Sequence, residues 1–411
     1  MTITLLSNYF DHKTVAKMNI AWINPRIIIG NTATGEYYFQ RPFIEDCIWE
    51  EIQKGNHVLI AAPRRVGKSS VMQAMLDRHP DNTRCIFKNI QSIKSEAEYY
   101  QRFYELLVQC LDRFGKDKAW LSGMIKGIKI DEITLEGVKF GDKKDINFAE
   151  EIKSLLTEIS KNKIRVVLLL DELPEVLNFL HKQKRDAEAS HILNHLRELR
   201  QNPSIRGHLS LVLAGSVGIQ HVVKAIEGRI ADLNDFNAVP FEPLSHEEAK
   251  AYLAWATQGA TVQYDAALSD CLLDHVRHFI PYFLNLMLDE INKSARKANN
   301  PAVTIAQVEA AFAVIVKNSD HFKEWKNRLS DYFSPEQAAF LNKVLTRIAH
   351  ESSITPQRLY DMATKHGLQD TYMELVRGLE HDGYLLEQGG THCFVSPFLQ
   401  AFWKLDNPIF Q

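Results

Sequence analysis

The stretch Val58–Ser70, VLIAAPRRVGKSS, constrains this chain more than any other part of the sequence. Its short apolar run predicts a buried strand, and Ser69-Ser70-Val71-Met72 begins a helical pattern, so a tight loop must join the two. Residues 62 to 69 match the pattern G-x-x-x-x-G-K-[ST], with Ala62 in place of the first glycine. In this context backbone N–H groups of the loop and of the helix N-terminus point at a phosphate. An ordinary strand-to-helix turn is the alternative, and the correct flanks favour the phosphate-binding loop.

The residues of this loop predict how it would bind ATP and Mg²⁺. Gly67 allows close backbone approach, Lys68 reaches the β- and γ-phosphates, and the Ser69 hydroxyl ligates Mg²⁺. Two arginines inside the loop either contact phosphate or face solvent. We therefore expect a binding site made of Ala62, Pro63, Arg64, Arg65, Val66, Gly67, Lys68, Ser69 and Ser70.

An acidic pair follows further along the chain. Val166–Leu170 are consecutive Val and Leu residues, which predicts a strand buried on both faces, as in the middle of a parallel sheet. Asp171 and Glu172 follow at its carboxyl end, where open α/β sheets bind ligands. Asp171 would hold Mg²⁺ directly or through water, and Glu172 would orient and deprotonate the attacking water. Two acids that merely end a strand are the alternative, which the upstream loop disfavours.

Two further residues are candidates with competing interpretations. Ser216 ends the apolar strand over 209–214, expected beside the acidic strand, so its hydroxyl could bond the γ-phosphate or the attacking water. A turn-forming serine fits that position almost as well. Arg229 could act in trans, as an arginine finger on the nucleotide of a neighbouring subunit. A surface arginine is the simpler interpretation of the same residue.

Composition excludes several classes of protein. A chain of 411 residues is too long for one ordinary core, and its formal net charge of −3 argues against a generally basic nucleic-acid binder. The five scattered cysteines fit structural thiols in a reduced compartment. We also predict that the chain has no transition-metal site. Without a leader or a membrane-spanning apolar run, the sequence predicts a cytoplasmic protein.

Alternating strands and helices predict a doubly wound, three-layer α/β domain over 36–240, preceded by an irregular or strand-forming arm at 1–35. Within it, a Lys- and Arg-rich helix is expected over 181–201. Residues 115–146 form either a surface hairpin or a solvated loop.

Helical patterns continue after Pro240 and Pro243. We expect a helical lid over 241–330 with helices at 246–257, 265–276, 281–297 and 304–317. Three helices and a hairpin over 331–411 describe a winged helix.

The expected recognition helix of that last domain has an acidic face made of Asp370, Glu374, Glu380 and Asp382, with Arg377 among them. Over 334–411 six Lys and Arg stand against nine Asp and Glu. Such a face repels phosphate, so DNA binding through it is disfavoured and packing against another domain or protein is favoured. The basic helix 181–201 keeps a nucleic-acid partner open.

Several short motifs, in this order, resemble the archaeal-type P-loop ATPases of the AAA+/STAND group, which are related to origin-recognition ATPases. They are Phe39-Gln40-Arg41, Pro63–Ser69, Leu170–Pro174, Ala214-Gly215-Ser216, Gly228-Arg229, and the closing Asp382-Gly383-Tyr384 and Phe394–Phe398. The resemblance implies that Lys68 and Ser69 bind phosphate and Mg²⁺, that Asp171 supports Mg²⁺, and that Glu172 is the base and Ser216 the first sensor. It also implies that Arg41 lies near the adenine.

The same resemblance matches Pro281 to a Gly-x-Pro lid motif that packs on the nucleotide, although Phe279 replaces the glycine. It does not explain the N-terminal arm.

The function expected from these observations is ATP binding and Mg²⁺-dependent hydrolysis that drives a conformational switch. A protein partner or a homo-oligomer would receive its output. A DNA-dependent ATPase of the initiator or transposition-helper type is one alternative, and a non-hydrolysing ATP-bound scaffold is another.

Overall fold

The structure is a computed structural model that describes residues 21–80, 83–112, 118–125, 128–134, 136–141, 146–215, 219–229 and 233–409. Within these residues the centre of the fold is a five-stranded sheet in the order β2-β5-β6-β1-β7. The strands are β1 (His57–Ala61), β2 (Thr83–Asn89), β5 (Arg165–Asp171), β6 (Leu209–Gly215) and β7 (Phe236–Ala238). All of their pairings are parallel, which confirms the predicted α/β fold class.

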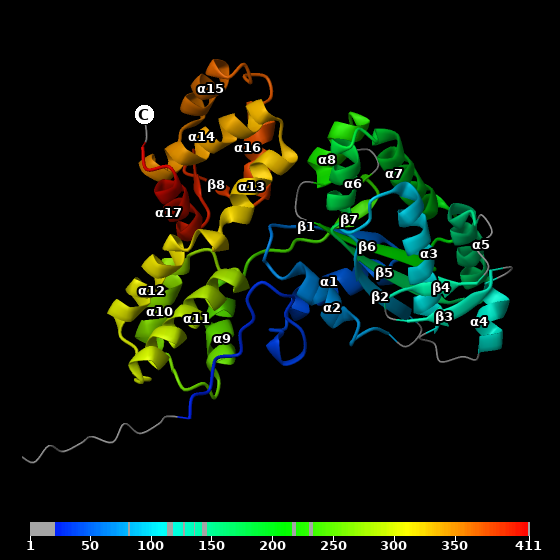
Figure 1. The fold of residues 1–411 in the computed structure, drawn as a ribbon, viewed down its shortest axis with the longest axis horizontal. Helices are drawn as coiled ribbons and strands as arrows, with labels where there is room; N and C mark the ends of the chain where they lie inside the picture. Colours follow the sequence, from blue (N-terminus) through cyan, green and yellow to red (C-terminus); the bar gives the residue numbers. More distant parts are fainter. Residues whose placement is uncertain are drawn as a thin grey trace, which may run out of the picture.

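The apolar run in β5 is buried on both faces, as predicted. Val167 and Leu169 pack in one hydrophobic cluster, whereas Val166, Leu168 and Leu170 pack in a second one. Because side chains alternate along a strand, the two clusters lie on opposite faces of the sheet. One includes α1 (Pro42–Gln53) and α2 (Lys68–Met75); the other includes α3 (Glu96–Asp112), α5 (Phe148–Lys161), α6 (Leu173–Lys182), α7 (Asp186–Gln201) and α8 (Ile219–Glu227). Figure 1 shows these helices around the sheet.

The basic stretch 181–201 differs from its prediction, because it spans two helices rather than one. α6 ends at Lys182 and α7 begins at Asp186. Lys184 between them has a φ of 57°, and the N–H of Arg185 turns back to the carbonyl of Leu180 at 2.9 Å. A left-handed residue of this kind commonly ends a helix.

The segment between α3 and α5 contains the hairpin that was one of two interpretations. β3 (Ile130–Ile133) pairs antiparallel with β4 (Val138–Phe140), and the short helix α4 (Lys118–Met124) precedes them.

The helices after β7 follow the expected pattern closely. They are α9 (His246–Thr257), α10 (Ala266–Val276), α11 (Pro281–Ala298) and α12 (Ile305–Lys317). The N-terminus of α9 has a capping box, in which the Glu248 N–H donates to the Ser245 hydroxyl and the Ser245 N–H donates to the Glu248 carboxylate. In Figure 1 these helices lie away from the sheet, beside the arm.

The C-terminal region contains the expected three helices and hairpin, flanked by two helices that the sequence analysis did not predict. The expected elements are α14 (Pro335–Glu351), α15 (Pro356–Lys365), α16 (Tyr372–His381), β8 (Leu385–Gln388) and β9 (Thr391–Phe394). The additional ones are α13 (Lys323–Tyr332) and α17 (Pro397–Asp406). Phe398 of α17 stacks on Phe283 of α11, with ring centroids 5.0 Å apart, so the chain end is packed against the lid helices.

The described part of the arm, from residue 21 onward, is irregular rather than strand-forming, which were the two interpretations of the sequence, and residues 1–20 lie outside the described residues. It runs along the lid, where the Trp22 indole donates to Asn292 (2.9 Å) and Asn285 donates to the carbonyl of Ile28 (3.0 Å). It then reaches α2, where the Ala33 N–H donates to the Ser70 hydroxyl (3.1 Å). The arm therefore links the lid to α2 of the α/β core.

No helix among the described residues is long and apolar enough to cross a membrane.

Candidate functional site

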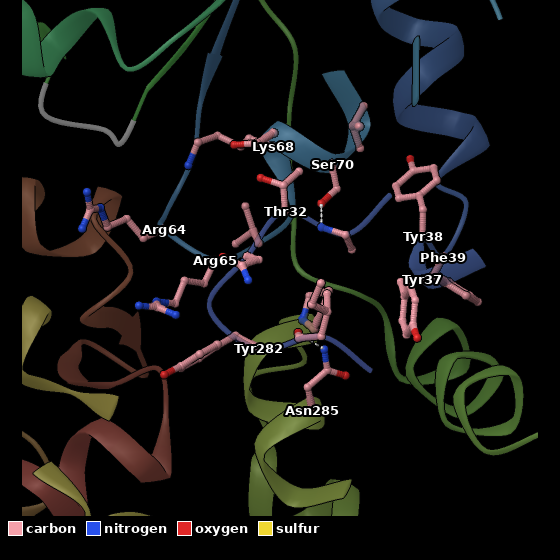
Figure 2. Close-up of a pocket in the computed structure, with 18 of the residues that line it drawn as sticks. Thr32, Tyr37, Tyr38, Phe39, Arg64, Arg65, Lys68, Ser70, Tyr282 and Asn285 are labelled. Carbon is pink, nitrogen blue, oxygen red and sulfur yellow. Dashed lines mark hydrogen bonds between the residues drawn. The ribbon is translucent and has the colours of Figure 1, made fainter. Parts of the chain in front are cut away.

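A cavity of about 310 Å³ lies where the loop after β1, the arm, the lid and α13 meet (Figure 2). From the loop and α2 it is lined by Arg64, Arg65, Val66, Gly67, Lys68, Ser69, Ser70 and Val71. From the arm and the approach to α1 it is lined by Ile28, Gly30, Asn31, Thr32, Ala33, Tyr37, Tyr38, Phe39 and Arg41. The remaining wall consists of Glu172, Leu244, Tyr252, Pro281, Tyr282, Asn285 and Glu324.

The loop has the backbone geometry that a phosphate-binding loop requires. Gly67, the residue before α2, has a φ of 106°, a value that residues with a Cβ rarely adopt. Arg65 also has a positive φ, of 63°. Because α2 begins at Lys68, its first N–H groups have no partner within the helix and are available to an anion at this end.

Lys68 is buried, and its ammonium group donates to the carbonyls of Ala62 and Pro63, each at 2.8 Å. Burial lowers the pKa of Lys68 to about 8, while the nearby charges of Glu172 and Asp171 act in the opposite direction. Ala62 and Pro63 thus support Lys68 and do not line the cavity themselves. A phosphate oxygen would be a stronger partner for this ammonium group than a neutral carbonyl.

The structure brings the acidic pair to the loop. Asp171 ends β5, and the Ser69 hydroxyl donates to its Oδ2 at 2.5 Å. Asp171 Oδ1 and Glu172 Oε2 are buried and have no hydrogen-bond partner among the described residues. Burial raises the pKa of both carboxyl groups, and the charge of Asp171 raises that of Glu172 further. Buried carboxylate oxygens without donors, beside a serine hydroxyl, fit a magnesium ion and a water molecule.

Glu172 has a left-handed backbone, with a φ of 63°, and directly precedes α6. Its N–H donates to the carbonyl of Ala214 on β6 at 2.9 Å, which fixes the turn. A Cβ on Gly215 would lie 2.4 Å from the ring of Pro174, so β6 and the start of α6 approach each other as closely as a glycine permits. The strained turn places Glu172 at the wall of the cavity.

The two weaker candidates have different outcomes. Ser216 lies outside the described residues, although β6 does pair with β5 as expected, with Asp171 opposite Ala214. Arg229 is exposed just after α8 and does not line the cavity.

The two loop arginines contact acidic residues and remain partly exposed. Arg65 Nη2 lies 2.8 Å from Glu324 Oε2, and the Arg65 guanidinium lies over the ring of Tyr282, 4.1 Å from its centroid. Arg64 lies 3.4 Å from the same oxygen of Glu324 and 3.7 Å from Glu175. Figure 2 shows Arg65 directed toward Tyr282 and Arg64 directed away from the lid. Burial favours a raised pKa for Glu324, but Arg65 and Arg64 hold it below its usual value.

Arg41 and Pro281 both line the cavity. Arg41 is buried, donates to the carbonyl of Glu242 at 3.1 Å and lies over the ring of Phe241. Pro281 is the first residue of α11. The fixed φ of proline suits that position.

Sequence reasoning missed much of the wall. The missed residues come from three segments: Tyr37 and Tyr38 near α1, Tyr252, Tyr282 and Asn285 in the lid, and Glu324 in α13. For Tyr37 and Tyr38, the available signal was the aromatic run Tyr37-Tyr38-Phe39, which lies next to the predicted site residue Arg41. The others are too far along the chain to be connected with the loop by any pattern.

The C-terminal region packs directly against the loop and the α/β core. A Cβ on Gly383 would lie 2.8 Å from two ring carbons of Pro63. Glu374, on the acidic face of α16, pairs with Lys224 of α8 at 2.6 Å. The Tyr332 hydroxyl donates to Glu175 at 2.5 Å. Glu374 of the acidic face thus contacts the α/β core of the same chain, while Asp370 and Arg377 of that face are exposed.

The basic residues of the α6–α7 region are largely paired with acids. Lys182 lies 3.3 Å from Asp331 of α13. Arg185 pairs with Glu188, and Arg200 pairs with Asp235. These pairs reduce the positive potential available to a nucleic acid.

One ligand-like spacing was overlooked. His191 and His195 are four residues apart on α7, a spacing that can bind a metal ion. His195 is buried among the rings of Tyr99, Tyr100 and Phe103, whereas His191 lies 3.1 Å from Glu96. No group of three or more potential metal-ligating side chains occurs in the described ranges.

A family model described as a predicted AAA-ATPase matches residues 34–225, from just before α1 into α8. No curated protein sequence is significantly similar to this chain. The fold is similar to that of the Walker-type ATPase PABY2304 of Pyrococcus abyssi, with a TM-score of 0.57 and 14% identity over 92% of this chain and 99% of that one. It is also similar to the ORC2 protein of Aeropyrum pernix, solved with ADPNP and ADP, with a TM-score of 0.50 and 12% identity over 89% and 91%.

Proposed function

We propose that this protein, which has the fold of AAA+ P-loop ATPases, binds ATP with Mg²⁺, hydrolyses it, and uses the nucleotide to switch conformation. The observation that carries the proposal is the contact between Ser69 and Asp171. It joins the phosphate-binding loop to the end of β5, beside two buried carboxylate oxygens that lack donors among the described residues.

In this proposal each residue of the site has a defined task. The N-terminus of α2 and Lys68 bind the β- and γ-phosphates, and Ser69 and Asp171 hold Mg²⁺, which neutralises charge on those phosphates when bound. Glu172 orients a water molecule and accepts its proton. The water oxygen bonds to the γ-phosphorus as the bond to the bridging oxygen breaks, and ADP and phosphate are the products. Ser216 as a sensor and Arg229 as a finger in trans remain part of the proposal.

The base and ribose would occupy the part of the cavity between the arm, Arg41 and the start of α11 at Pro281. Because the arm, the core, the lid and α13 all contribute to the wall, a bound nucleotide contacts each of them. Their relative positions then depend on the nucleotide, which is the basis of the proposed switch. Arg229, exposed beside the core, suits a homo-oligomer or a protein partner. We assign residues 36–240, 241–330 and 331–411 to the core, lid and winged-helix domains.

The test measures ATP binding and ATP turnover by the wild type and by Lys68→Ala. Loss of a charged donor to phosphate should weaken binding roughly a hundredfold and abolish turnover. Lys161→Ala is the matched control, because Lys161 is exposed at the end of α5 and pairs only locally with Glu158. A Lys68→Ala protein with unchanged affinity for ATP would overturn the proposal.

The same assay with duplex and single-stranded DNA separates the alternatives. Turnover that is indifferent to DNA supports a switch directed at a protein. Turnover stimulated by DNA, and strongly weakened by salt, would favour the DNA-dependent ATPase. Binding without any turnover in the presence of Mg²⁺ would favour the scaffold.

A further inference from the structure

We infer that Glu324 makes this site discriminate between nucleoside diphosphates and triphosphates, because its carboxylate takes the two loop arginines that a terminal phosphate would otherwise contact. The inference rests on the proposed function, since it concerns the same nucleotide site. It adds a specificity-determining residue from α13, a helix outside both the phosphate-binding loop and the acidic strand.

In the structure, the Glu324 carboxylate occupies the position beside the loop arginines that an anionic ligand such as phosphate would take. One oxygen of Glu324 lies 2.8 Å from Arg65 and 3.4 Å from Arg64, and all three residues line the cavity. Both arginines lie between β1 and α2, directly before the residues that would bind phosphate. Guanidinium groups bind carboxylate and phosphate with the same donor geometry, so the two anions compete for these arginines.

The pairs are of a kind that a ligand can displace. The Glu324 side chain is 51% exposed, and the arginine side chains are 26% and 23% exposed. Ion pairs at such positions contribute little to stability, because solvent screens them and side-chain entropy opposes them. A phosphate with more charge and more oxygens can therefore replace Glu324. Arg64 also keeps a second acidic partner, Glu175, when Glu324 leaves.

The backbone of Glu324 is held on both sides. Phe322 is fully buried and packs on Phe398 and Phe402 of α17, and Trp325 packs on Phe283 of α11. Displacement of Glu324 is therefore a rotation of its side chain, and the carboxylate stays near the site when it has lost its partners. A nearby negative charge raises the free energy of any bound anion, and the effect grows with the charge of that anion.

These steps give opposite consequences for the two nucleotides. A diphosphate, which reaches the loop through its β-phosphate, leaves the pairs with Arg64 and Arg65 in place. A triphosphate must break those pairs and then lie beside an unpaired carboxylate. Glu324 thus lowers the affinity for ATP relative to ADP and keeps the site selective for the product nucleotide.

The experiment measures equilibrium binding of MgATP and MgADP to the wild type and to Glu324→Gln. The amide keeps the shape of the side chain and removes the charge, so affinity for ATP should rise roughly tenfold, within the usual range of such couplings, and affinity for ADP should change far less. Asp320→Asn is the matched control, since it removes one acidic charge nearby, and Asp320 pairs with Lys323 rather than with the loop. Its ratio of affinities should equal that of the wild type.

A double-mutant cycle with Arg65→Gln gives a second readout. If Glu324 acts through the arginines, Glu324→Gln should have a smaller effect on the ATP-to-ADP ratio when Arg65 is absent. A ratio that Glu324→Gln leaves unchanged, in a protein whose ATP binding requires Lys68, would overturn this inference and leave the proposed function intact. ATP binding that does not require Lys68 would overturn the proposed function itself.

Discussion

Two pairs of charged residues border the cavity, and they differ in whether their charges are already satisfied. The acidic pair at the end of β5 has buried oxygens without hydrogen-bond partners among the described residues. The arginine pair in the loop contacts Glu324 and Glu175. When a ligand supplies a partner to an unsatisfied buried group, the free energy of the complex falls. A group that is already satisfied must first lose its existing partner, which offsets the gain. In the proposed function the acidic pair is therefore prepared for metal and water, whereas the arginines can bind a ligand only by exchanging partners.

This difference also separates affinity from discrimination. Unpaired carboxylate oxygens favour binding of any ligand that supplies hydrogen-bond donors or a cation. Groups that are already paired add selectivity, because only a ligand with sufficient charge can take over their contacts. Mutations at either pair, at Lys68 and at the contact between Gly383 and Pro63 test this contrast.

The largest effect is expected at the unsatisfied pair. Glu172→Gln keeps the shape of the side chain and removes its ability to accept a proton, so turnover should fall by about 10² to 10⁴-fold while ATP still binds. Steady-state turnover and equilibrium binding would be measured on the same protein. Glu175→Gln serves as a comparison, because Glu175 does not line the cavity and should retain most of the turnover. Normal turnover in Glu172→Gln would show that this carboxylate is not the base.

An intermediate effect is expected from pH, through Lys68. Burial lowers its pKa to about 8 in the free protein, and ATP binds the protonated form more tightly because phosphate is anionic. The affinity for ATP should be highest below pH 8, where Lys68 is protonated. It should fall as the pH rises above 8, by at most about tenfold per pH unit. Binding of ATP measured between pH 7 and 10 tests this sign.

The matched variant for the pH series is Lys68→Arg, whose guanidinium stays protonated over the whole range. It should show a flat profile above pH 8, even if its absolute affinity is lower. A wild-type affinity that is constant from pH 7 to 10 would contradict the assignment of Lys68 as the phosphate-binding cation.

The smallest effect is expected from packing between the loop and the C-terminal region. Gly383→Ala would place a Cβ 2.8 Å from the ring of Pro63, at a φ of 74°. Overpacking should lower the free energy of unfolding by about 1–3 kcal/mol, and thermal unfolding would report it. Gly389→Ala separates packing from backbone strain, because its φ is 58° with no atom within 4 Å of the added Cβ. Equal destabilisation by the two variants would mean that the contact with Pro63 is unimportant.

Local patterns predicted most of the core. The Val and Leu run of β5 identified a central strand because both faces of the sheet are covered. The helical pattern after Pro243 identified α9, whose capping box lies within residues three apart in the sequence. The loop after β1 was identified for the same reason, since its chemistry is contained in consecutive residues. Assignment of the roles within it stays a prediction.

The missed features depend on contacts between distant residues. α13 has the sequence KEWKNRLSDY, in which Trp325, Arg328 and Leu329 are buried. A stripe with so few apolar residues gives little periodic signal. Glu324 lies 259 residues from Arg65 in the sequence, and only the folded chain shows that they meet. The break at Lys184 was missed because neither glycine nor proline marks it.

The arm has a consequence for the order in which the cavity can be completed during synthesis. Its residues leave the ribosome first, yet the carbonyl of Ile28 is bound by Asn285, 257 residues later. Ala33 meets its partner Ser70 after only 37 residues. A nascent chain that has finished the α/β core therefore has the phosphate end of the cavity in place and its opposite wall still missing. In the proposed function, tight nucleotide binding must therefore await translation of α11, which contributes Pro281, Tyr282 and Asn285 to that wall.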